Sequence, residues 1–332
     1  MTADVVCLRP EADFREVGVA PPAGLRICYG EPGSVPDADL NNARALVLAS
    51  VGPRLSRHWL DRAGRLELVQ FTGAGVDRVS GAVAHRPDLA VANVPGANVH
   101  EVAEYVLLAT GTLLRGLALA DREIRAGRYA EVRARLSPAA VRSLHSRTIG
   151  IVGLGQVGLA VARVMRAVGA KVAYTDPSPP DPPAAERLGL DRLNLNDLLA
   201  RCDVVTVHVP LLPGTRNLIG ERELRGMRRG GLLINASRGG VVDEEALARV
   251  LADGHLGGAA VDVYEQEPPG PCSALLTLPD RIARRVLYTP HIAGVAYEAA
   301  CNLYTEAWAN VLRVLVQELP ARHRVSSHPR SG

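Results

Sequence analysis

Three residues of this chain have the side chains needed to move a proton next to a bound acid: Arg238, Glu267 and His291. An imidazole exchanges a proton near neutral pH, and a neighbouring carboxylate orients it and stabilises its charged form. A guanidinium offers two parallel hydrogen bonds to a carboxylate or a polarised carbonyl. The set therefore predicts acid–base chemistry on a small acid, with Arg238 holding the acid group and His291 paired with Glu267.

Each of these residues also has a simpler interpretation. A single histidine after a strand is more often a surface or core residue than a catalyst. Arg238 alone is compatible with a structural ion pair in an arginine-rich chain, and Glu267, before Pro268, with a loop acid. The joint functional interpretation is favoured because all three accompany a dinucleotide-binding loop.

That loop lies within "TIGIVGLGQVGLAVARVMRAVGAKVAYTD", residues 148–176. An apolar strand runs into Gly153, Gly155 and Gly158, and a helix follows from about Gln156. The first glycine permits a tight turn, the second lets the backbone approach a pyrophosphate, and the third packs helix against sheet. A glycine-rich βα turn without a ligand is the alternative. The strand before, the helix after and the acid at the end of the next strand favour dinucleotide binding.

The acid at the end of that next strand is Asp176. A carboxylate in this place accepts hydrogen bonds from the adenosine ribose and repels a 2′-phosphate. Residues 177–179 supply no arginine that would attract such a phosphate. The predicted cofactor is NAD, which carries a hydride and leaves the proton to the protein.

The elements that must position these residues follow from alternating apolar runs and helical patterns, which are typical of parallel sheets with crossover helices. We expect an α/β fold with two doubly wound parallel-sheet domains of the Rossmann and flavodoxin type, the second sheet being the longer. Long helices are expected at 99–126 and 296–318, and loops at 177–183 and 268–271. The expected strands are 4–8, 26–29, 45–48, 66–71, 89–92, 148–152, 171–175, 203–208, 231–235, 257–261 and 286–288.

Polar residues follow four strands of the second domain. Ligands of open α/β sheets bind outside the carboxyl ends of the strands. His208, Arg238, the acidic segment 262–267 and His291 each come after a different strand. We therefore expect them at one edge, together with the glycine loop.

Composition excludes several other classes of protein. Of the 332 residues, 47% are hydrophobic and 22% charged, and the net charge of +3 comes without a dominant basic block. The small arginine clusters at 225–229 and 281–285 contain no interleaved aromatic residues, so we interpret them as solvated faces rather than nucleic-acid sites. The apolar stretch 102–119 is interrupted by Glu104 and Arg115, which argues against a membrane span.

The five cysteines are scattered, odd in number and without CxxC spacing. This pattern predicts neither a disulfide framework nor a metal site. The first residues, MTADVVCLRP, do not have the form of a secretion signal. A cytoplasmic location is expected.

Across nearly its whole length the chain resembles the D-isomer-specific 2-hydroxyacid dehydrogenase family. The matching segments include "GIVGLGQVG", "VVTVHVPLLPGTRNLI", "LLINASRGGVVDEEAL", "AAVDVYEQEP" and "TPHIAG", and, in the N-terminal part, "LVQFTGAGVDRV" and "VANVPGANVHEVAEYVLL". The resemblance implies catalysis by Arg238, Glu267 and His291. The residues that it implies for the substrate are Thr72, Gly73, Ala74, Gly75, Arg238 and His291. Those implied for the cofactor are Gly153, Gly155, Gln156, Val157, Gly158, Asp176, His208, Val209, Pro210, Thr215, Ala236, Ser237, Asp262 and Gly294.

The resemblance also implies a domain layout and an assembly. Residues 1–98 with 296–332 would form a discontinuous substrate domain, and residues 99–295 the NAD-binding Rossmann domain. Members are commonly homodimers through the long helix. Glu101 stands where relatives usually have a small or hydroxyl residue, and the segment 280–286 is longer than usual. We interpret that segment as a solvated loop, with contact between its arginines and an extra anion of the substrate as the alternative.

The function that we expect is that of an NAD-dependent oxidoreductase acting on a 2-keto or (R)-2-hydroxy acid, that is, a 2-keto acid reductase or the reverse. The alternative is an NAD(H)-sensing, corepressor-like binding protein on the same fold. Formate dehydrogenases of this family have glutamine where Glu267 stands, so the acid argues against that activity. The particular acid and the direction of the reaction stay open.

Overall fold

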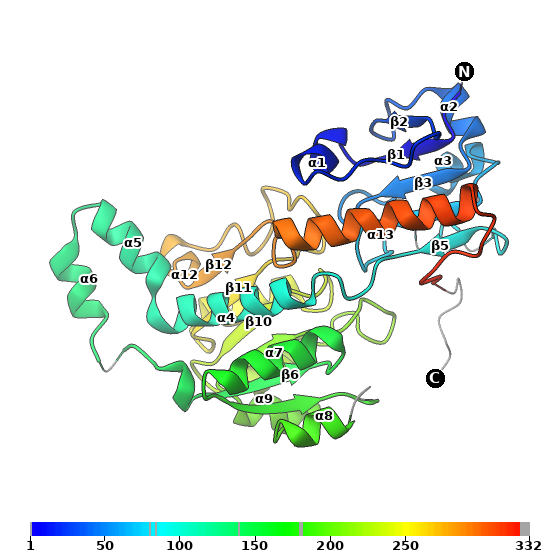
Figure 1. The fold of residues 1–332 in the computed structure, drawn as a ribbon. Coiled ribbons are helices and arrows are strands. Elements are labelled where there is room, and N and C mark those ends of the chain that lie inside the picture. Colours follow the sequence, from blue (N-terminus) through cyan, green and yellow to red (C-terminus); the bar gives the residue numbers. More distant parts are fainter. Residues whose placement is uncertain (1, 80, 84, 139, 179–181, 326–332) are drawn as a thin grey trace. The chain divides into compact units, whose positions relative to one another are not determined.

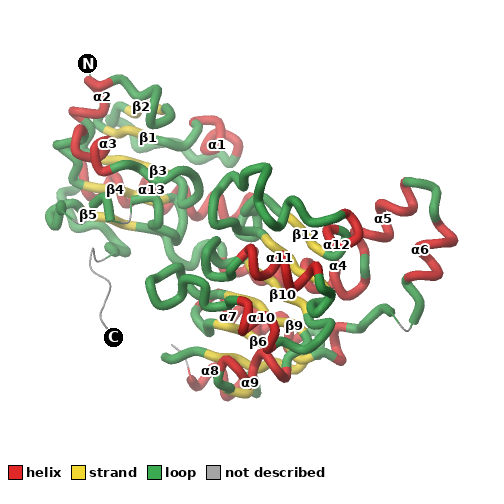
Figure 2. Tube along the Cα trace, turned by 180° about the vertical axis from the view of Figure 1, so that it is seen from behind, coloured by secondary structure: helices red, strands yellow, loops and turns green. Residues whose placement is uncertain are grey.

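A computed structural model describes the chain except residues 1, 80, 84, 139, 179–181 and 326–332 (Figure 1). The chain divides into two compact units. Unit 1 comprises Met1–Asn98 and Val295–Gly332, and unit 2 comprises Val99–Gly294. Each unit contains one sheet in which all neighbouring strands are parallel, with helices on both faces (Figure 2). The expected α/β class with two parallel-sheet domains is confirmed.

Unit 1 has a five-stranded sheet with the order β2-β1-β3-β4-β5. Its strands are β1 (Val5–Cys7), β2 (Ile27–Tyr29), β3 (Ala45–Leu48), β4 (Leu68–Phe71) and β5 (Ala90–Ala92), and its helices α1 (Glu11–Glu16), α2 (Asp37–Asn42), α3 (Arg57–Arg62) and α13 (Tyr297–Leu315). The central strands are apolar along their length because both faces are covered. On one face Trp308 and Tyr304 of α13 pack against Phe14 of α1, with ring centroids 5.3 and 4.7 Å apart.

Unit 2 has a seven-stranded sheet with the order β12-β11-β10-β9-β6-β7-β8. Its strands are β6 (Thr148–Val152), β7 (Lys171–Thr175), β8 (Asp191–Arg192), β9 (Val204–Val207), β10 (Leu232–Asn235), β11 (Gly258–Val261) and β12 (Val286–Tyr288). The chain builds the sheet from β6 outward in one direction and from β9 in the other. The carboxyl ends of β6 and β9 therefore form the topological switch point, where ligands bind in folds of this kind.

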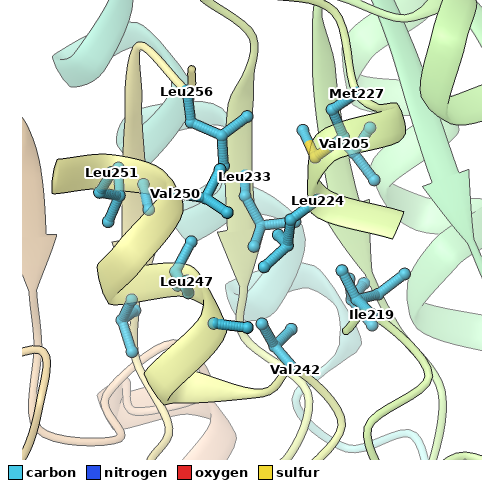
Figure 3. Packing of buried hydrophobic residues seen from close by; sticks show 14 of the residues in the cluster. Val205, Ile219, Leu224, Met227, Leu233, Val242, Leu247, Val250, Leu251 and Leu256 are labelled. Atoms are coloured by element: carbon cyan, nitrogen blue, oxygen red, sulfur yellow. The ribbon is translucent and has the colours of Figure 1, made fainter. Parts of the chain in front are cut away.

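Helices cover both faces of this sheet. The helices of unit 2 are α4 (Val99–Arg115), α5 (Leu117–Arg125), α6 (Tyr129–Arg135), α7 (Gln156–Ala167), α8 (Pro182–Arg187), α9 (Leu195–Arg201), α10 (Glu221–Gly226), α11 (Glu244–Ala252) and α12 (Asp280–Ala283). On one face α4 and α7 lie side by side and share an apolar cluster with β6 (Figure 1). On the other face Leu247 and Leu251 of α11 and Leu224 of α10 meet Leu233 of β10 (Figure 3). The sheet is thus held rigidly on both sides.

The expectation of one continuous helix over 99–126 was wrong. The helix breaks at Gly116, whose φ of +63° is left-handed, and α4 and α5 meet at an angle of 61°. Glycine adopts this conformation without the steric cost that a β-carbon brings. Within the described residues no single helix is long and apolar enough to cross a membrane, and only the bent pair of α4 and α5 reaches that length and composition.

Two predicted loops also contain helices. Of the expected loop 177–183, residues 179–181 lie outside the described part, and α8 begins at Pro182. Proline is well suited to a first helical turn, where its missing N–H would have no partner. The segment 280–286 contains α12 rather than a solvated loop. Arg285 donates to the carbonyls of Leu251 and Leu256 at 2.7 and 3.1 Å, so it supports the end of α11.

Candidate active site

His291 and Glu267 form a direct pair. The Nδ1 atom of His291 lies 3.0 and 2.9 Å from the two carboxylate oxygens of Glu267. Because an ionised carboxylate only accepts hydrogen bonds, Nδ1 carries the hydrogen, and in the neutral ring Nε2 has a lone pair. Both side chains are about one-fifth exposed, at 22% and 20%. The histidine is thus fixed in orientation and partly sheltered from water, and the Nε2 lone pair of its neutral form is left to accept a proton.

The pKa of Glu267 lies below its ordinary value of 4.5. Burial acts against this shift, but the hydrogen bond and charge of His291, the N–H of Tyr264 and the charge of Arg238 outweigh it. The Tyr264 N–H donates to Glu267 Oε1 at 3.1 Å. Glu267 is therefore an anion at neutral pH, able to stabilise a protonated His291.

Arg238 stands on a turn after β10 that packs directly against the turn after β11. A β-carbon on Gly239 would overlap the carbonyl group of Tyr264, so only glycine fits there. Gly240 has a φ of +79°. Asn235 secures the same turn, because its Oδ1 accepts from the hydroxyl of Ser237 at 2.8 Å. The glycines next to Arg238 thus allow two neighbouring strand ends to meet, which brings the charge of Arg238 close to Glu267.

The turn that carries His291 has an unusual backbone. His291 has a φ of +55°, a conformation that non-glycine residues rarely adopt. Asp262, fully buried at the end of β11, accepts from the N–H groups of Ile292 and Ala293 at 2.8 and 2.9 Å. The backbone N–H of His291 donates to the carbonyl of Asp262 at 2.8 Å. Asp262 therefore holds the histidine turn, a role that the sequence interpretation missed when it placed this residue only at the cofactor.

The glycine loop fits a pyrophosphate. Gly153 has a φ of +92°, and a β-carbon there would lie 2.7 Å from Val209 and 2.8 Å from the carbonyl oxygen of His208. A β-carbon on Gly158 would overlap the carbonyl oxygen of Gly153. Gly155, in contrast, faces open space, and as N-cap of α7 it leaves the first N–H groups without a side-chain cap. Open space before an uncapped helix end is what an anionic phosphate needs.

Asp176 is anchored to this loop. Its Oδ2 accepts from the N–H of Leu154 at 2.8 Å, and its Oδ1 from the N–H of Ser178 at 2.8 Å. Each carboxylate oxygen has a second lone pair, so the side chain can still accept from ribose hydroxyls. The residues present therefore fit NAD, with Gln156 and Val157 in the first turn of α7 beside the phosphate position.

His208 follows β9 at the same edge, and its Nε2 lies 2.8 Å from Thr206 Oγ1. Burial lowers the pKa of His208 to about 3, so the ring is neutral and is not a second proton donor at physiological pH. Thr215 stabilises the turn 210–215 through a hydrogen bond from the N–H of Leu212 at 2.8 Å. Contacts of Val209, Pro210, Thr215, Ala236, Ser237 and Gly294 with a cofactor stay predictions.

The predicted substrate loop 72–75 follows β4 in unit 1. Thr72 continues the strand pairing, since its N–H donates to the carbonyl of Leu48 at 2.9 Å. The backbone N–H of Thr72 is therefore already in use and is not free to bind a substrate. A β-carbon on Gly73 would lie too close to the hydroxyl of Ser50, and the carbonyl of Ala74 accepts from Asn93 at 2.6 Å. Thr72, Gly73 and Gly75 of this loop are buried, and Ala74 is exposed.

Comparison with known proteins matches this geometry to a family. Residues 107–293 match the NAD-binding domain of the D-isomer specific 2-hydroxyacid dehydrogenases. A (S)-sulfolactate dehydrogenase of Chromohalobacter salexigens is 38% identical over 82% of this chain and 84% of its own length. A D-3-phosphoglycerate dehydrogenase of Archaeoglobus fulgidus is 34% identical over 80% of this chain, which spans about half (48%) of that relative.

Among solved structures, an NADPH-dependent glyoxylate/hydroxypyruvate reductase from Sinorhizobium meliloti is similar over 98% of both chains. The TM-score is 0.81 and the sequence identity 28%. The agreement extends over both units. The chain belongs to the D-isomer specific 2-hydroxyacid dehydrogenase family, and residues 107–293 are its NAD-binding domain.

Proposed function

We propose that the protein is an oxidoreductase that interconverts a 2-keto acid and the corresponding (R)-2-hydroxy acid with NAD. The observation that carries this proposal is the hydrogen-bonded pair of His291 and Glu267, at the same sheet edge as the glycine loop. Membership of the family and the names of its relatives support it. We assign residues 1–98 with 296–332 to substrate binding and 99–295 to NAD.

The proton steps follow from the tautomer of His291. When bound at the glycine loop, NADH would supply a hydride for the keto carbon, and the substrate oxygen would then need one proton. His291 donates that proton from Nε2, and the anion of Glu267 stabilises the protonated ring beforehand. In the reverse direction the neutral Nε2 removes the proton of the hydroxyl group. Glu267 keeps its charge throughout and acts by orientation and electrostatics.

Arg238 is proposed to bind the carboxylate of the substrate. A guanidinium forms two hydrogen bonds with a carboxylate in a fixed plane, which orients the adjoining keto group. The turn that carries it is rigid, because Gly239 packs on Tyr264 and Asn235 holds Ser237. Backbone N–H groups of Gly73, Ala74 and Gly75 are proposed as further donors, whereas the N–H of Thr72 pairs with Leu48.

NAD is proposed over NADP on the basis of Asp176. Its carboxylate is held at the glycine loop by Leu154 and Ser178, so it cannot move away from a 2′-phosphate without losing both bonds. We expect a catalytic efficiency with NADH at least tenfold higher than with NADPH. Equal use of the two cofactors contradicts this assignment.

The experiment that tests the reaction follows NADH absorbance with a panel of keto acids. The panel contains glyoxylate, hydroxypyruvate and the keto forms of sulfolactate and 3-phosphoglycerate, because relatives and structural neighbours carry names of such compounds. Turnover with any of them supports an enzyme. NADH binding without turnover of any member favours the alternative, an NAD(H)-sensing binding protein.

A homodimer is proposed from the exposed apolar side chains on α4, α5 and α6. Leu108, Leu117 and Tyr129 are 67%, 55% and 66% exposed. Large apolar side chains exposed on a surface are typical of protein interaction sites. Light scattering is expected to give twice the mass of one chain, and a monomer at micromolar concentration refutes the assembly.

A cytoplasmic location is proposed from the cysteines. All five lie in the described part of the chain and are free thiols. Free thiols persist in reducing compartments. Fractionation of cells producing the protein tests the location, and recovery outside the cytoplasm contradicts it.

A further inference from the structure

A chain of hydroxyl groups joins helix α4 to the turn that carries His291. The hydroxyl of Tyr105 lies 2.7 Å from Thr289 Oγ1. The hydroxyl of Thr289 lies 2.6 Å from Asp262 Oδ1. Tyr105 and Thr289 are separated by 184 residues in sequence, and neither belongs to the proposed set of catalytic and binding residues. These hydroxyl groups therefore connect helix α4, on one face of the sheet, with the buried carboxylate of Asp262 at the edge of the sheet.

The direction of each hydrogen bond follows from the number of protons available. The carboxylate of Asp262 accepts, so the hydroxyl of Thr289 uses its only proton to donate to it. Thr289 Oγ1 must then accept from Tyr105. Burial raises the pKa of Tyr105 to about 12, so its hydroxyl keeps its proton at neutral pH. All three members are thus locked into one pattern of donors and acceptors.

The carboxylate at the end of this chain is the one that holds the histidine turn. Asp262 Oδ1 accepts from Thr289 and also from the N–H of Ile292, and Oδ2 accepts from Ala293. The donors therefore stand on both sides of His291 in sequence. A change in the position of this carboxylate moves the turn as a whole.

The backbone of Thr289 is held as firmly as its side chain. Its N–H donates to the carbonyl of Val261 at 3.0 Å, and its carbonyl accepts from the hydroxyl of Tyr264 at 3.2 Å. The left-handed φ of His291 needs such support, because a non-glycine residue keeps this conformation only where its surroundings impose it.

We propose that Tyr105 and Thr289 are positioning residues, which keep Asp262 and the His291 turn in the geometry that directs Nδ1 at Glu267. Neither touches the reacting atoms. Their loss lets the turn relax from the left-handed conformation, so that His291 is less often paired with Glu267 and in place for proton transfer. This inference rests on the proposed function for its effect on catalysis, but not for its effect on the histidine.

The kinetic test compares Tyr105→Phe, Thr289→Val and Thr289→Ser. Thr289→Val removes the hydroxyl at nearly constant volume, and we expect kcat to fall on the order of tenfold or more. Tyr105→Phe removes the hydrogen bond between Tyr105 and Thr289, and we expect kcat to fall about fivefold. Thr289→Ser keeps the hydroxyl and is expected to restore most of the activity. The affinity for NADH is expected to stay within about twofold, because a single distant hydrogen bond carries little of it.

Tyr288→Phe is the matched control. Tyr288 neighbours Thr289, is half-buried, and donates its hydroxyl to the carbonyl of Leu275 at 2.8 Å, away from Asp262. Removing the hydroxyl of Tyr288 costs a comparable hydrogen bond but is expected to leave kcat unchanged. If this variant loses as much activity as Thr289→Val, or if Thr289→Val retains full activity, the positioning role is wrong.

A second measurement separates this inference from the proposed function. Nuclear magnetic resonance of the protein with labelled histidine reports the Nδ1 proton of His291 in its bond to Glu267, without any turnover. We expect this signal in the wild type and its weakening in Thr289→Val and Tyr105→Phe. An unchanged signal refutes the inference. A weakened signal in a protein that reduces no keto acid refutes the proposed function while supporting the inference.

Discussion

Gly239 lies directly against the carbonyl group of Tyr264, which occupies the place that a β-carbon on residue 239 would need. Gly239 follows β10 and Tyr264 follows β11, so the two turns that deliver Arg238 and Glu267 touch through their backbones. This contact explains how a guanidinium and a carboxylate from separate strands come close enough for one to lower the pKa of the other.

Gly239→Ala is expected to destabilise unit 2 and reduce activity. The added methyl group forces the two turns apart, and overpacking of this kind costs about 2 kcal/mol or more. Urea unfolding and kcat are the measurements. Gly226→Ala, at the end of α10 where no atom lies within 4 Å, is the control and is expected to be neutral. An unchanged stability and kcat in Gly239→Ala would show that the turns have room to separate.

Gly155→Ala and Gly158→Ala are expected to fail in different ways. Gly155 faces open space and has no left-handed φ, so Ala should fold normally but weaken NADH binding by filling the phosphate position. Gly158→Ala overlaps the carbonyl of Gly153 and is expected to lower stability first. Thermal unfolding and NADH fluorescence titration distinguish the two. Unimpaired NADH binding in Gly155→Ala contradicts the proposed site.

Arg238→Ala is expected to lower kcat/KM for the keto acid roughly a hundredfold, because a charge-assisted pair with the carboxylate is lost. This fall corresponds to a loss of about 3 kcal/mol of transition-state stabilisation. The affinity for NADH should stay within about twofold of the wild-type value, because a residue that binds the substrate acid does not hold the cofactor. Arg222→Ala removes a guanidinium that is 88% exposed and serves as control. A collapse of NADH affinity together with activity assigns Arg238 to the cofactor instead.

His291→Ala is expected to lower kcat by about 10²- to 10⁴-fold, the range typical of a lost general acid. The residual rate should depend less on pH, because the group that exchanges the proton is gone. His58→Ala, on the exposed surface of α3, is the control. A variant without His291 that keeps the wild-type rate across the pH range would remove the histidine from the mechanism.

His208 is expected to make the stability depend on pH. Its folded pKa of about 3 lies below the ordinary 6.5, so between these values the unfolded chain binds a proton that the folded chain does not. The free energy of unfolding is therefore unaffected above pH 6.5 and falls as the pH drops towards 3, by about 2 kcal/mol at pH 5. Urea unfolding at pH 7.5 and 5 of the wild type and His208→Asn measures this difference. Identical pH dependence in both proteins means that His208 is not buried as a neutral ring.

Local sequence signals were enough to predict the glycine loop and the strands around it. Gly153, Gly155 and Gly158 have fixed spacing, and the apolar runs before and after them have lengths typical of buried parallel strands. Because the carboxyl ends of parallel strands share one edge, the approximate location of Arg238 and His291 also followed from their place after such runs. The chain by itself thus determined the fold class and the family.

The break in the long helix and the contacts between distant segments could not be predicted in this way. The break at Gly116 depends on a left-handed backbone, which a single glycine in a helical pattern does not by itself predict. Thr289 lies two residues before His291 in "TPHIAG", and Tyr105 is the only aromatic residue of α4, but no local pattern joins them.

The sequence alone determined which residue types stand at the ends of the strands. It could do so because strands and the turns that follow them depend on interactions between near neighbours in the chain. Only the tertiary structure decided that Asp262 holds the turn of His291, that Gly239 packs on Tyr264, and that Tyr105 reaches Thr289. These contacts depend on how the strands are ordered and how the helices pack on them. Hydrogen bonds act over about 3 Å, whereas Tyr105 and Thr289, which one of them joins, are 184 residues apart in the sequence.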